Sequence, residues 1–351
     1  MKITHVLWGL QTGGTEYMLA DIANEQVKTD EVFVIVVDDN VDKNVLSKFS
    51  SKISFFFCNR KRGHKSIIAV AKLNFYLFKI SPDITHLHMG YGLGKMVLWP
   101  GKKVRTVHNT TNSPAEYHKF DRIVAISKAV QKEICSYGFE SILVSNGVKI
   151  DAIKHRDLKK EKNGCVHIVQ IGRLFSKQKG QDLLIKAVDC LVKASDLRYL
   201  PPFKIHFVGS GDDLDYLQKM ISEKQLEKYF IFEGAKDRDW IYSHLCDFDL
   251  FVQPSYYEGF GLSVVEAAAA KIPVLVSNIE GPKEILYKDG EFVGWLFNVG
   301  DVADLSKKIA DFLNGKYDDN LCEKAYEHMA KYNVLRTASE YLSLYRELLS
   351  K

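Results

Sequence analysis

The sequence of 351 residues has neither paired cysteines nor a long apolar run. Its six cysteines are scattered, without a C-x-x-C pair, at positions 58, 135, 165, 190, 246 and 322. This spacing excludes a disulfide framework and a cysteine-rich zinc site, and it favours a reducing compartment. No apolar run approaches the roughly 18 residues that span a bilayer. Because the first apolar segment, Ile3–Leu7, is also too short for a signal peptide, we expect a cytoplasmic protein.

Two nucleotide-binding motifs are missing as well. The chain has no G-x-x-x-x-G-K-[ST] sequence, which excludes a P-loop ATPase. Its first glycine turn, residues 9–14, lacks the G-x-G-x-x-G fingerprint of nicotinamide-binding domains. Three D-x-D strings, at 213–215, 237–239 and 247–249, are what a chain with 44 acidic residues contains by chance. We therefore expect no bound metal and no other cofactor.

The composition is that of an ordinary globular protein of about two domains, with 46% hydrophobic and 26% charged residues. The net charge of +4 is unevenly spread. Residues 1–160 carry 24 Lys/Arg and 15 Asp/Glu (+9), and the remainder carries 24 and 29 (−5). A basic N-terminal half favours an anionic partner, such as a membrane surface or a phosphorylated acceptor, and we expect no nucleic acid.

The most informative stretch runs from residue 251 to residue 284. A short apolar strand at 250–252 is followed by a glycine-bearing turn at 258–262, an alanine-rich helix that Pro273 ends, and a second buried strand at 274–276. A strand, a glycine turn and a helix amino terminus together form an anion site, because backbone N–H groups converge there and the helix dipole favours negative charge.

Two glutamates, Glu258 and Glu266, bracket this turn, on roughly the same face. Carboxylates repel an anion but bind hydroxyl groups well, so they suit a sugar or a ribose. Further along the C-terminal half, Arg173 follows a predicted strand at 166–171, and Lys179 precedes a predicted helix at 181–192. These two cations are placed to hold a diphosphate from two sides, although surface cations on a loop would look the same.

In the N-terminal half, polar residues follow predicted strands. Gly13 and Gly14 open a helix with Glu16 in its first turn, which allows a ligand to approach the backbone, although a plain turn would look the same. His88 and His108 each end a strand, where open parallel sheets bind ligands. A histidine that merely caps a strand is the alternative for either one.

A basic cluster precedes the predicted helix 66–80, which is apolar and aromatic. The residues of this cluster that could contact the acceptor or a membrane are Arg60, Lys61, Arg62 and Lys65. Glu16 and His88 are further candidates for contact with the acceptor. Basic groups beside an apolar helix suit an interfacial membrane contact. A buried crossover helix next to a solvated loop is the other interpretation.

These motifs together resemble the retaining nucleotide-sugar glycosyltransferases of family 4. The resemblance rests on the E-x7-E pattern within EGFGLSVVEA, the GG-x-E turn, the PD-x-x-H-x-H and T-x-H-[DN] strand ends, and the G-R-L…K-G spacing. The resemblance covers nearly the whole chain. Within the family, the chain is similar to bacterial O-antigen and capsule glycosyltransferases. One departure is Lys149, where the family's N-G-V-D has aspartate.

The resemblance implies an α/β protein of the GT-B fold, with two Rossmann-like domains facing each other across a cleft. Residues 1–155 would form the acceptor-side and membrane-side domain, residues 164–335 the donor domain, and residues 336–351 a helix that crosses back onto the first domain. Catalytic roles are implied for His108, Glu258, Arg173 and Lys179. Donor binding is implied for Gly13, Gly14, Arg173, Lys179, Gly209, Glu258, Gly259, Phe260, Gly261, Leu262 and Glu266.

The implied reaction is metal-independent, retaining transfer of a hexose-type sugar. The donor would be a UDP-sugar, or GDP-mannose, and the acceptor a glycan, most simply one linked to a polyprenyl diphosphate. The protein would then work in the cytoplasm or at the cytoplasmic face of the inner membrane. Other GT-B activities, such as a nucleotide-sugar epimerase or a phosphorylase, and an inactive nucleotide-sugar-binding subunit stay open as alternatives.

Overall fold

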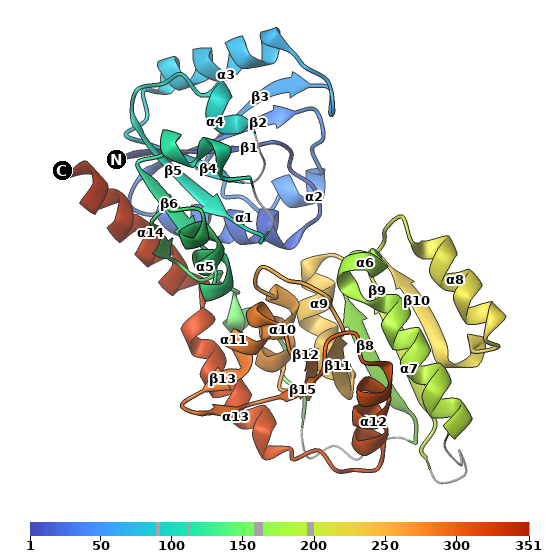
Figure 1. Cartoon of the computed structure of the whole chain (residues 1–351). Coiled ribbons are helices and arrows are strands. Elements are labelled where there is room, and N and C mark those ends of the chain that lie inside the picture. Colours follow the sequence, from blue (N-terminus) through green and yellow to red (C-terminus); the bar gives the residue numbers. More distant parts are fainter. Residues whose placement is uncertain (89–91, 111–112, 158–163, 195–199, 351) are drawn as a thin grey trace. The chain divides into compact units, whose positions relative to one another are not determined.

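The computed structural model describes residues 1–88, 92–110, 113–157, 164–194 and 200–350 (Figure 1). The chain divides into two compact units: residues 1–149 with 332–351 form unit 1, and residues 150–331 form unit 2. Part of the expected linker, residues 158–163, lies outside the described residues. Residues 150–157 belong to unit 2, where the Arg156 guanidinium lies 3.2 Å from the Asp249 carboxylate.

Unit 1 is built on a parallel sheet of seven described strands in the order β3-β2-β1-β4-β5-β6-β7. The strands are β1 (Lys2–Leu7), β2 (Glu31–Asp38), β3 (Ser54–Arg60), β4 (Ile84–His88), β5 (Lys102–Val107), β6 (Arg122–Ala125) and β7 (Ile142–Leu143). The helices are α1 (Gly14–Gln26), α2 (Lys43–Leu46), α3 (Ile67–Ile80), α4 (Leu93–Met96), α5 (Lys128–Ser136), α14 (Val334–Leu349) and the short 3-10 helix η1 (Pro114–Lys119).

The two faces of this sheet are covered by different helices. Helices α1 and α14 pack over one face, where Ile3, Ile84 and Val104 share a core with Tyr341 of the C-terminal helix. Helix α3 covers the other face beside β2 and β3 (Figure 1). The C-terminal helix therefore belongs to the core of unit 1, as the predicted GT-B fold requires.

Unit 2 repeats the design with six described parallel strands in the order β10-β9-β8-β11-β12-β15. The strands are β8 (Val166–Ile171), β9 (Phe203–Val208), β10 (Phe230–Gly234), β11 (Leu250–Gln253), β12 (Val274–Ser277) and β15 (Trp295–Phe297), with a separate antiparallel pair β13 (Tyr287–Lys288) and β14 (Glu291–Phe292). The helices are α6 (Ser176–Lys179), α7 (Gln181–Ala194), α8 (Leu214–Glu223), α9 (Arg238–His244), α10 (Leu262–Ala269), α11 (Glu280–Leu286), α12 (Val302–Leu313) and α13 (Asn320–Met329), with 3-10 turns η2 (Ile150–Ala152), η4 (Glu227–Tyr229), η5 (Leu245–Asp247) and η6 (Ala330–Tyr332).

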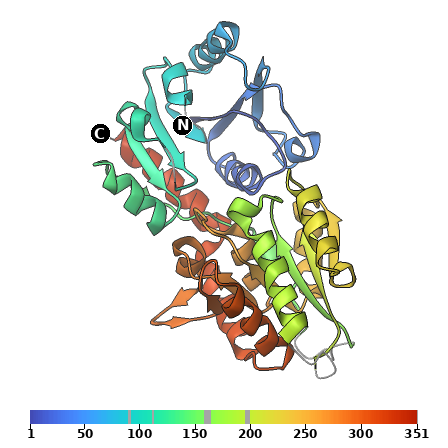
Figure 2. The ribbon, with the colours of Figure 1, turned by 45° about the vertical axis from the view of Figure 1, so that its right-hand side comes forward.

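Helices α7 and α12 lie side by side against one face of this second sheet (Figure 2). Their apolar residues, including Leu184, Val188 and Ile309, share one core with the strand residues Ile168 and Leu250. In both units the second and third strands lie on one side of the first strand, and the fourth strand lies on its other side. This reversal of strand order is the switch point at which open α/β sheets bind ligands.

Candidate functional site

In unit 2, the candidate donor-binding residues other than Gly209 follow the two strands at the switch point. Strands β8 and β11 are neighbours in the sheet. Arg173 follows the carboxyl end of β8, and Glu258 lies in the turn that follows β11. Lys179 is the last residue of α6, which the same β8 loop carries. Parallel strands therefore bring together residues that are about 80 positions apart in the chain.

Lys179 and Glu258 form an ion pair in which both side chains are largely buried. The Glu258 Oε1 atom also accepts hydrogen bonds from Gln253 Nε2 at 2.7 Å and from Ser255 Oγ at 3.1 Å. Gln253 is fixed in turn, because its Oε1 atom accepts a hydrogen bond from Ser263 Oγ at 2.8 Å. The carboxylate is thus held in one orientation before any ligand arrives.

Two buried glutamines hold the loop that carries the cations. The Gln170 amide donates to the Lys179 carbonyl at 2.8 Å, and the Gln181 amide donates to the Arg173 carbonyl at 2.9 Å. The Arg173 side chain is exposed. Sequence reasoning missed Gln170, Gln181 and Gln253. For Gln170 and Gln253, the available signal was a glutamine near the end of a mostly apolar strand, β8 and β11.

Glycines let these loops approach one another closely. Gly180 has φ +67°, and a Cβ there would lie 1.9 Å from the Pro254 carbonyl oxygen. Gly209 has φ +148°, and a Cβ there would lie 2.0 Å from the Gly172 carbonyl oxygen. Gly209, which was predicted to bind the donor, therefore allows the loop after β9 to pack closely against the loop after β8.

The glycine turn predicted to bind an anion ends at the amino terminus of α10. Gly261 precedes the helix with φ +121°, and no side chain caps it. Phe260 is buried, and a Cβ at Gly281 would lie 2.7 Å from the Phe260 carbonyl oxygen, so α11 packs directly against the turn. Glu266 lies in the second turn of α10 and is half-buried.

In unit 1, the Gly13–Gly14 turn begins helix α1. Gly13 has extended backbone and Gly14 is the first helical residue. A Cβ at Gly13 would lie 2.5 Å from Glu16 Oε2, so the Glu16 carboxylate lies over the amino terminus of its own helix. A carboxylate is stabilised there by the helix dipole.

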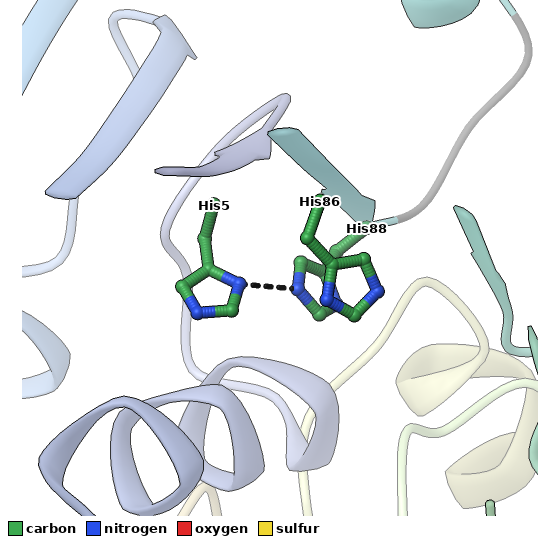
Figure 3. Close-up of side chains that lie close together, drawn as sticks. All are labelled: His5, His86 and His88. Carbon is green, nitrogen blue, oxygen red and sulfur yellow. Dashed lines mark hydrogen bonds between the residues drawn. The ribbon is translucent and has the colours of Figure 1, made fainter. Parts of the chain in front are cut away.

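One of the two predicted histidines of unit 1, His88, lies in a buried cluster with His5 and His86 on the neighbouring strands β1 and β4 (Figure 3). His5 of β1 pairs in register with His86 of β4, and His5 Nδ1 lies 2.9 Å from His88 Nε2. His5 Nε2 lies 2.8 Å from Gln26 Oε1. His108, directly after β5, has its ring centre 5.8 Å from that of His88.

Hydrogen-bond chemistry assigns the protons in this chain. The Gln26 oxygen can only accept, so His5 donates from Nε2 and accepts at Nδ1 from His88 Nε2–H. His88 Nδ1 is then a buried acceptor without a hydrogen-bond partner among the described residues, and both ring nitrogens of His108 are also buried without one.

Burial keeps the cluster neutral. It lowers the pKa of His5 to about 4, against a smaller raising effect from the Gln26 hydrogen bond. Burial, and then the nearby Arg105 charge, lowers the pKa of His108 to about 4. The pKa values of His86 and His88 are lowered in the same direction by burial and by their histidine neighbours.

His86 links the cluster to the C-terminal helix. Its Nδ1 atom lies 2.5 Å from the Tyr345 hydroxyl, and its Nε2 atom lies 2.7 Å from Thr106 Oγ1. Thr106 continues to the Tyr341 hydroxyl at 2.9 Å. His86 entered the sequence prediction only within the P-D-x-x-H-x-H motif and was assigned no role. His5 was not singled out, and its only signal was a polar residue inside a buried strand.

The cluster has the spacing of a metal site but the hydrogen bonding of a polar core. Among the described residues, His5, His86 and His88 form the one group whose ligand atoms lie close enough to hold a metal, all within 4.8 Å. Both ring nitrogens of His5 and of His86 already have hydrogen-bond partners. A metal would have to displace those bonds, so the donor set does not fit a resident ion.

The basic residues predicted as one patch separate in the structure. Arg60 lies 2.6 Å from the Asp38 carboxylate and 4.0 Å above the Trp8 ring, so its charge is used within the fold. Lys61, Arg62 and Lys65 are exposed. Among the described residues, no helix combines the length and the apolar character needed to cross a membrane.

Comparisons with known proteins agree with this architecture. Residues 151–333, just over half of the chain, match the family model described as glycosyl transferases group 1, and residues 12–152 match glycosyltransferase family 4. The structure of HepE from Anabaena in complex with UDP and glucose has a TM-score of 0.78 at 19% identity, over 98% of this chain and 99% of that one. At this identity the likeness shows the fold, and it confirms the predicted GT-B fold.

Two curated relatives match parts of the chain. The poly(ribitol-phosphate) alpha-N-acetylglucosaminyltransferase of Staphylococcus aureus (strain COL) is 29% identical over 237 residues, which is 65% of this chain and 44% of the relative. Protein CapJ of Staphylococcus aureus is 28% identical over 172 residues, which is 48% of this chain and 41% of the relative. The chain thus spans less than half the length of these two relatives.

Proposed function

Because the chain belongs to the glycosyl transferases group 1 family, we propose that it is a retaining glycosyltransferase with a nucleotide-sugar donor. The donor is a UDP-linked hexose, with GDP-mannose as the second choice, and the acceptor is a lipid-linked glycan in bacterial polysaccharide assembly. The relative named for poly(ribitol phosphate) and the UDP-bound HepE structure support these choices. The observation that carries the proposal is the partly buried Lys179–Glu258 pair at the switch point of unit 2.

The proposed chemistry follows from where charge develops. When the anomeric C–O bond breaks, negative charge grows on the leaving diphosphate, and fixed donors aimed at it lower the barrier. Arg173 and Lys179 supply those donors. The Lys179 ammonium has three N–H groups, so it can keep its bond to Glu258 while it binds a phosphate oxygen.

The carboxylates take the hydroxyl groups in this proposal. Glu258 orients the transferred sugar, and Glu266 holds the ribose of the nucleotide. His108 contacts the sugar as a neutral imidazole, because its pKa of about 4 keeps it uncharged at pH 7. No residue is assigned as a covalent nucleophile, and the leaving diphosphate accepts the proton of the acceptor hydroxyl.

A thermal-shift panel of UDP, GDP, ADP and their sugar conjugates, each with and without EDTA, tests the donor site. A ligand that binds only the folded protein raises the melting temperature, with about 2.7 kcal/mol of stabilisation at 100 times its Kd. We expect one base, UDP, to give a clear shift that EDTA leaves unchanged. The absence of a shift with every nucleotide would contradict the proposal.

Product analysis then separates transfer from the alternatives. Retention predicts that the new glycosidic bond keeps the anomeric configuration of the donor, which NMR of the product reads directly. An epimerase would change the nucleotide sugar without an acceptor, a phosphorylase would carry a pyridoxal absorbance, and a binding subunit would shift in melting temperature without turnover. Any of these three results would replace transfer as the function.

A further inference from the structure

We propose that the outer face of helix α3, together with Leu98, is a docking surface for an anionic lipid bilayer. Helix α3 is apolar on two sides. One stripe, Ala69, Leu73 and Leu77, is buried against the sheet of unit 1. The opposite side exposes Ile67 (89%), Ile68 (71%), Phe75 (63%) and Phe78 (57%).

The exposed residues form one continuous stripe. Ile67, Ala71, Phe75 and Phe78 are spaced by four, four and three positions, which places them on a single face of the helix. A solvated surface helix carries polar residues on that face. Large apolar side chains there instead indicate an interaction surface.

The neighbouring loop extends the stripe and is held firmly. Leu98 is 67% exposed, and its backbone N–H donates to the Asn74 side chain of α3 at 2.8 Å. The Asn74 amide in turn donates to the Met96 carbonyl at 2.8 Å. The Trp99 ring packs edge-on against Phe78, with ring centres 5.2 Å apart. The surface is therefore preformed.

The basic residues around this surface indicate which partner covers it. Residues 43–115 contain 13 Lys/Arg and a single acidic residue, Asp83. Of the basic groups, Lys61, Arg62 and Lys65 are exposed just before α3, and Lys79 is exposed on it. A second copy of this chain docked face to face would bring these positive charges together. An anionic bilayer satisfies both features, because its headgroups attract the cations while its acyl region accepts the apolar side chains.

The docking surface would bring unit 1 to the lipid-linked acceptor, and in this respect it rests on the proposed function. Its test needs no enzymatic activity. The full chain is sedimented with vesicles of phosphatidylcholine alone and of phosphatidylcholine mixed with phosphatidylglycerol. We expect binding to the anionic vesicles only, weakened by added salt. Pelleting with neither vesicle type, or equally with both, would overturn the proposal.

Two sets of variants locate the contact. Phe75→Ser with Phe78→Ser removes exposed rings, and Lys61→Glu, Arg62→Glu and Lys65→Glu reverse the charge. The charge-reversal set should lower vesicle binding at least tenfold, since each basic residue near an anionic surface changes binding about fivefold. The phenylalanine set should lower it as well, because less apolar surface enters the bilayer. The matched controls lie in unit 2 and should not change vesicle binding. They are Tyr216→Ser with Tyr287→Ser, and Lys219→Glu with Lys307→Glu and Lys324→Glu, all at exposed residues.

Two readouts distinguish this proposal from others. The nucleotide-induced thermal shift should be the same in all variants, so loss of vesicle binding with an intact shift supports the docking surface whether or not transfer is observed. Unchanged vesicle binding in the α3 variants would place the contact elsewhere and refute the proposal. A dimer in solution that the Phe75 and Phe78 changes dissociate would assign the face to a second copy instead.

Discussion

The two units share one sheet order, yet the polar groups at their switch points are opposite in character. Unit 1 gathers His5, His86 and His88, which burial keeps neutral. Unit 2 places an ion pair, Lys179 with Glu258, in the segments that follow the corresponding strands β8 and β11, whereas the three histidines lie on the strands themselves. The same backbone topology therefore positions polar residues in both units, and the depth of burial and the available partners decide whether those residues carry charge.

A second histidine pair makes the same point within unit 2. His167 Nδ1 lies 2.9 Å from His206 Nε2, much as His5 lies from His88. His206 Nδ1 lies 2.9 Å from the Glu233 carboxylate, whereas the corresponding partner of His5 is the side-chain amide of Gln26. Burial lowers the pKa of His206, and the hydrogen bond to Glu233 works against that effect. The pKa of His206 stays lowered on balance, so the Glu233 carboxylate opposes the effect of burial without cancelling it, as the Gln26 amide does for His5.

The largest expected difference between the two units is their stability in acid, which should fall more in unit 1. The folded pKa values of His5 and His108, about 4, lie below the unfolded value of 6.5, so the unfolded chain binds more protons between these limits. Stability is therefore present above pH 6.5 and is lost as pH falls toward 4, by up to about 3 kcal/mol per histidine.

Hydrogen exchange measured along a pH series checks this. Amides of β1, β4 and β5 should lose protection at a higher pH than those of β8 and β11. Parallel loss of protection in both units would show that the histidine cluster does not govern acid stability.

The charged site of unit 2 should control turnover. Glu258→Gln keeps the shape but removes the charge that holds Lys179, and we expect the transfer rate to fall about 10²-fold to 10³-fold. The UDP-induced thermal shift should persist, because the cations remain. Glu223→Gln, an exposed carboxylate on α8, is the control and should leave the rate unchanged. A Glu258 variant with the parental rate would remove this residue from the site.

Close loop packing distinguishes the unit 2 site from an ordinary turn. Gly180→Ala introduces a Cβ 1.9 Å from the Pro254 carbonyl in addition to a strained φ of +67°. Gly315→Ala has a similar φ of +74° with no atom within 4 Å, so it isolates the backbone strain. We expect Gly180→Ala to be less stable than Gly315→Ala by about 2 kcal/mol in chemical unfolding. Equal losses would mean that the loop yields freely.

The smallest effect concerns the attachment of α14 to unit 1. Tyr345→Phe removes the hydroxyl 2.5 Å from His86 Nδ1 and leaves a buried ring nitrogen unpaired. This should lower the free energy of unfolding by about 1–2 kcal/mol. Tyr287→Phe, on an exposed strand of unit 2, should change it by almost nothing. If both variants have the same melting temperature, the His86–Tyr345 bond contributes no net stability.

Local pattern predicted the elements well where apolar period and turn residues agree. The first apolar segment, residues 3–7, lies in β1 (Lys2–Leu7), and the helix expected at 66–80 is α3, with the Ser66 side chain capping it. The last helix was expected from residue 336 but begins at Val334. The Asn333 side chain accepts a hydrogen bond from the Leu335 N–H and so adds a first turn that the apolar period does not reveal.

The candidate site was less accessible to sequence reasoning, because its contacts join distant residues. Pattern pointed to Glu258 and Lys179 separately, and strand pairing between β8 and β11 brings them together. It also pointed to His88, while His5, 83 positions earlier, was not recognised as its partner. Arg60 was grouped with Lys61 and Arg62, although Asp38 on the neighbouring strand neutralises it.

The amino-acid sequence alone determines the alternation of strands and helices, the positions of the glycine turns and the uneven charge, because these depend on neighbours within a few positions. Tertiary structure alone decides which polar groups are buried together, which cations stay free and which apolar face of α3 meets solvent. Those outcomes depend on desolvation and on partners tens to hundreds of residues away, as the bond between His86 and Tyr345 illustrates.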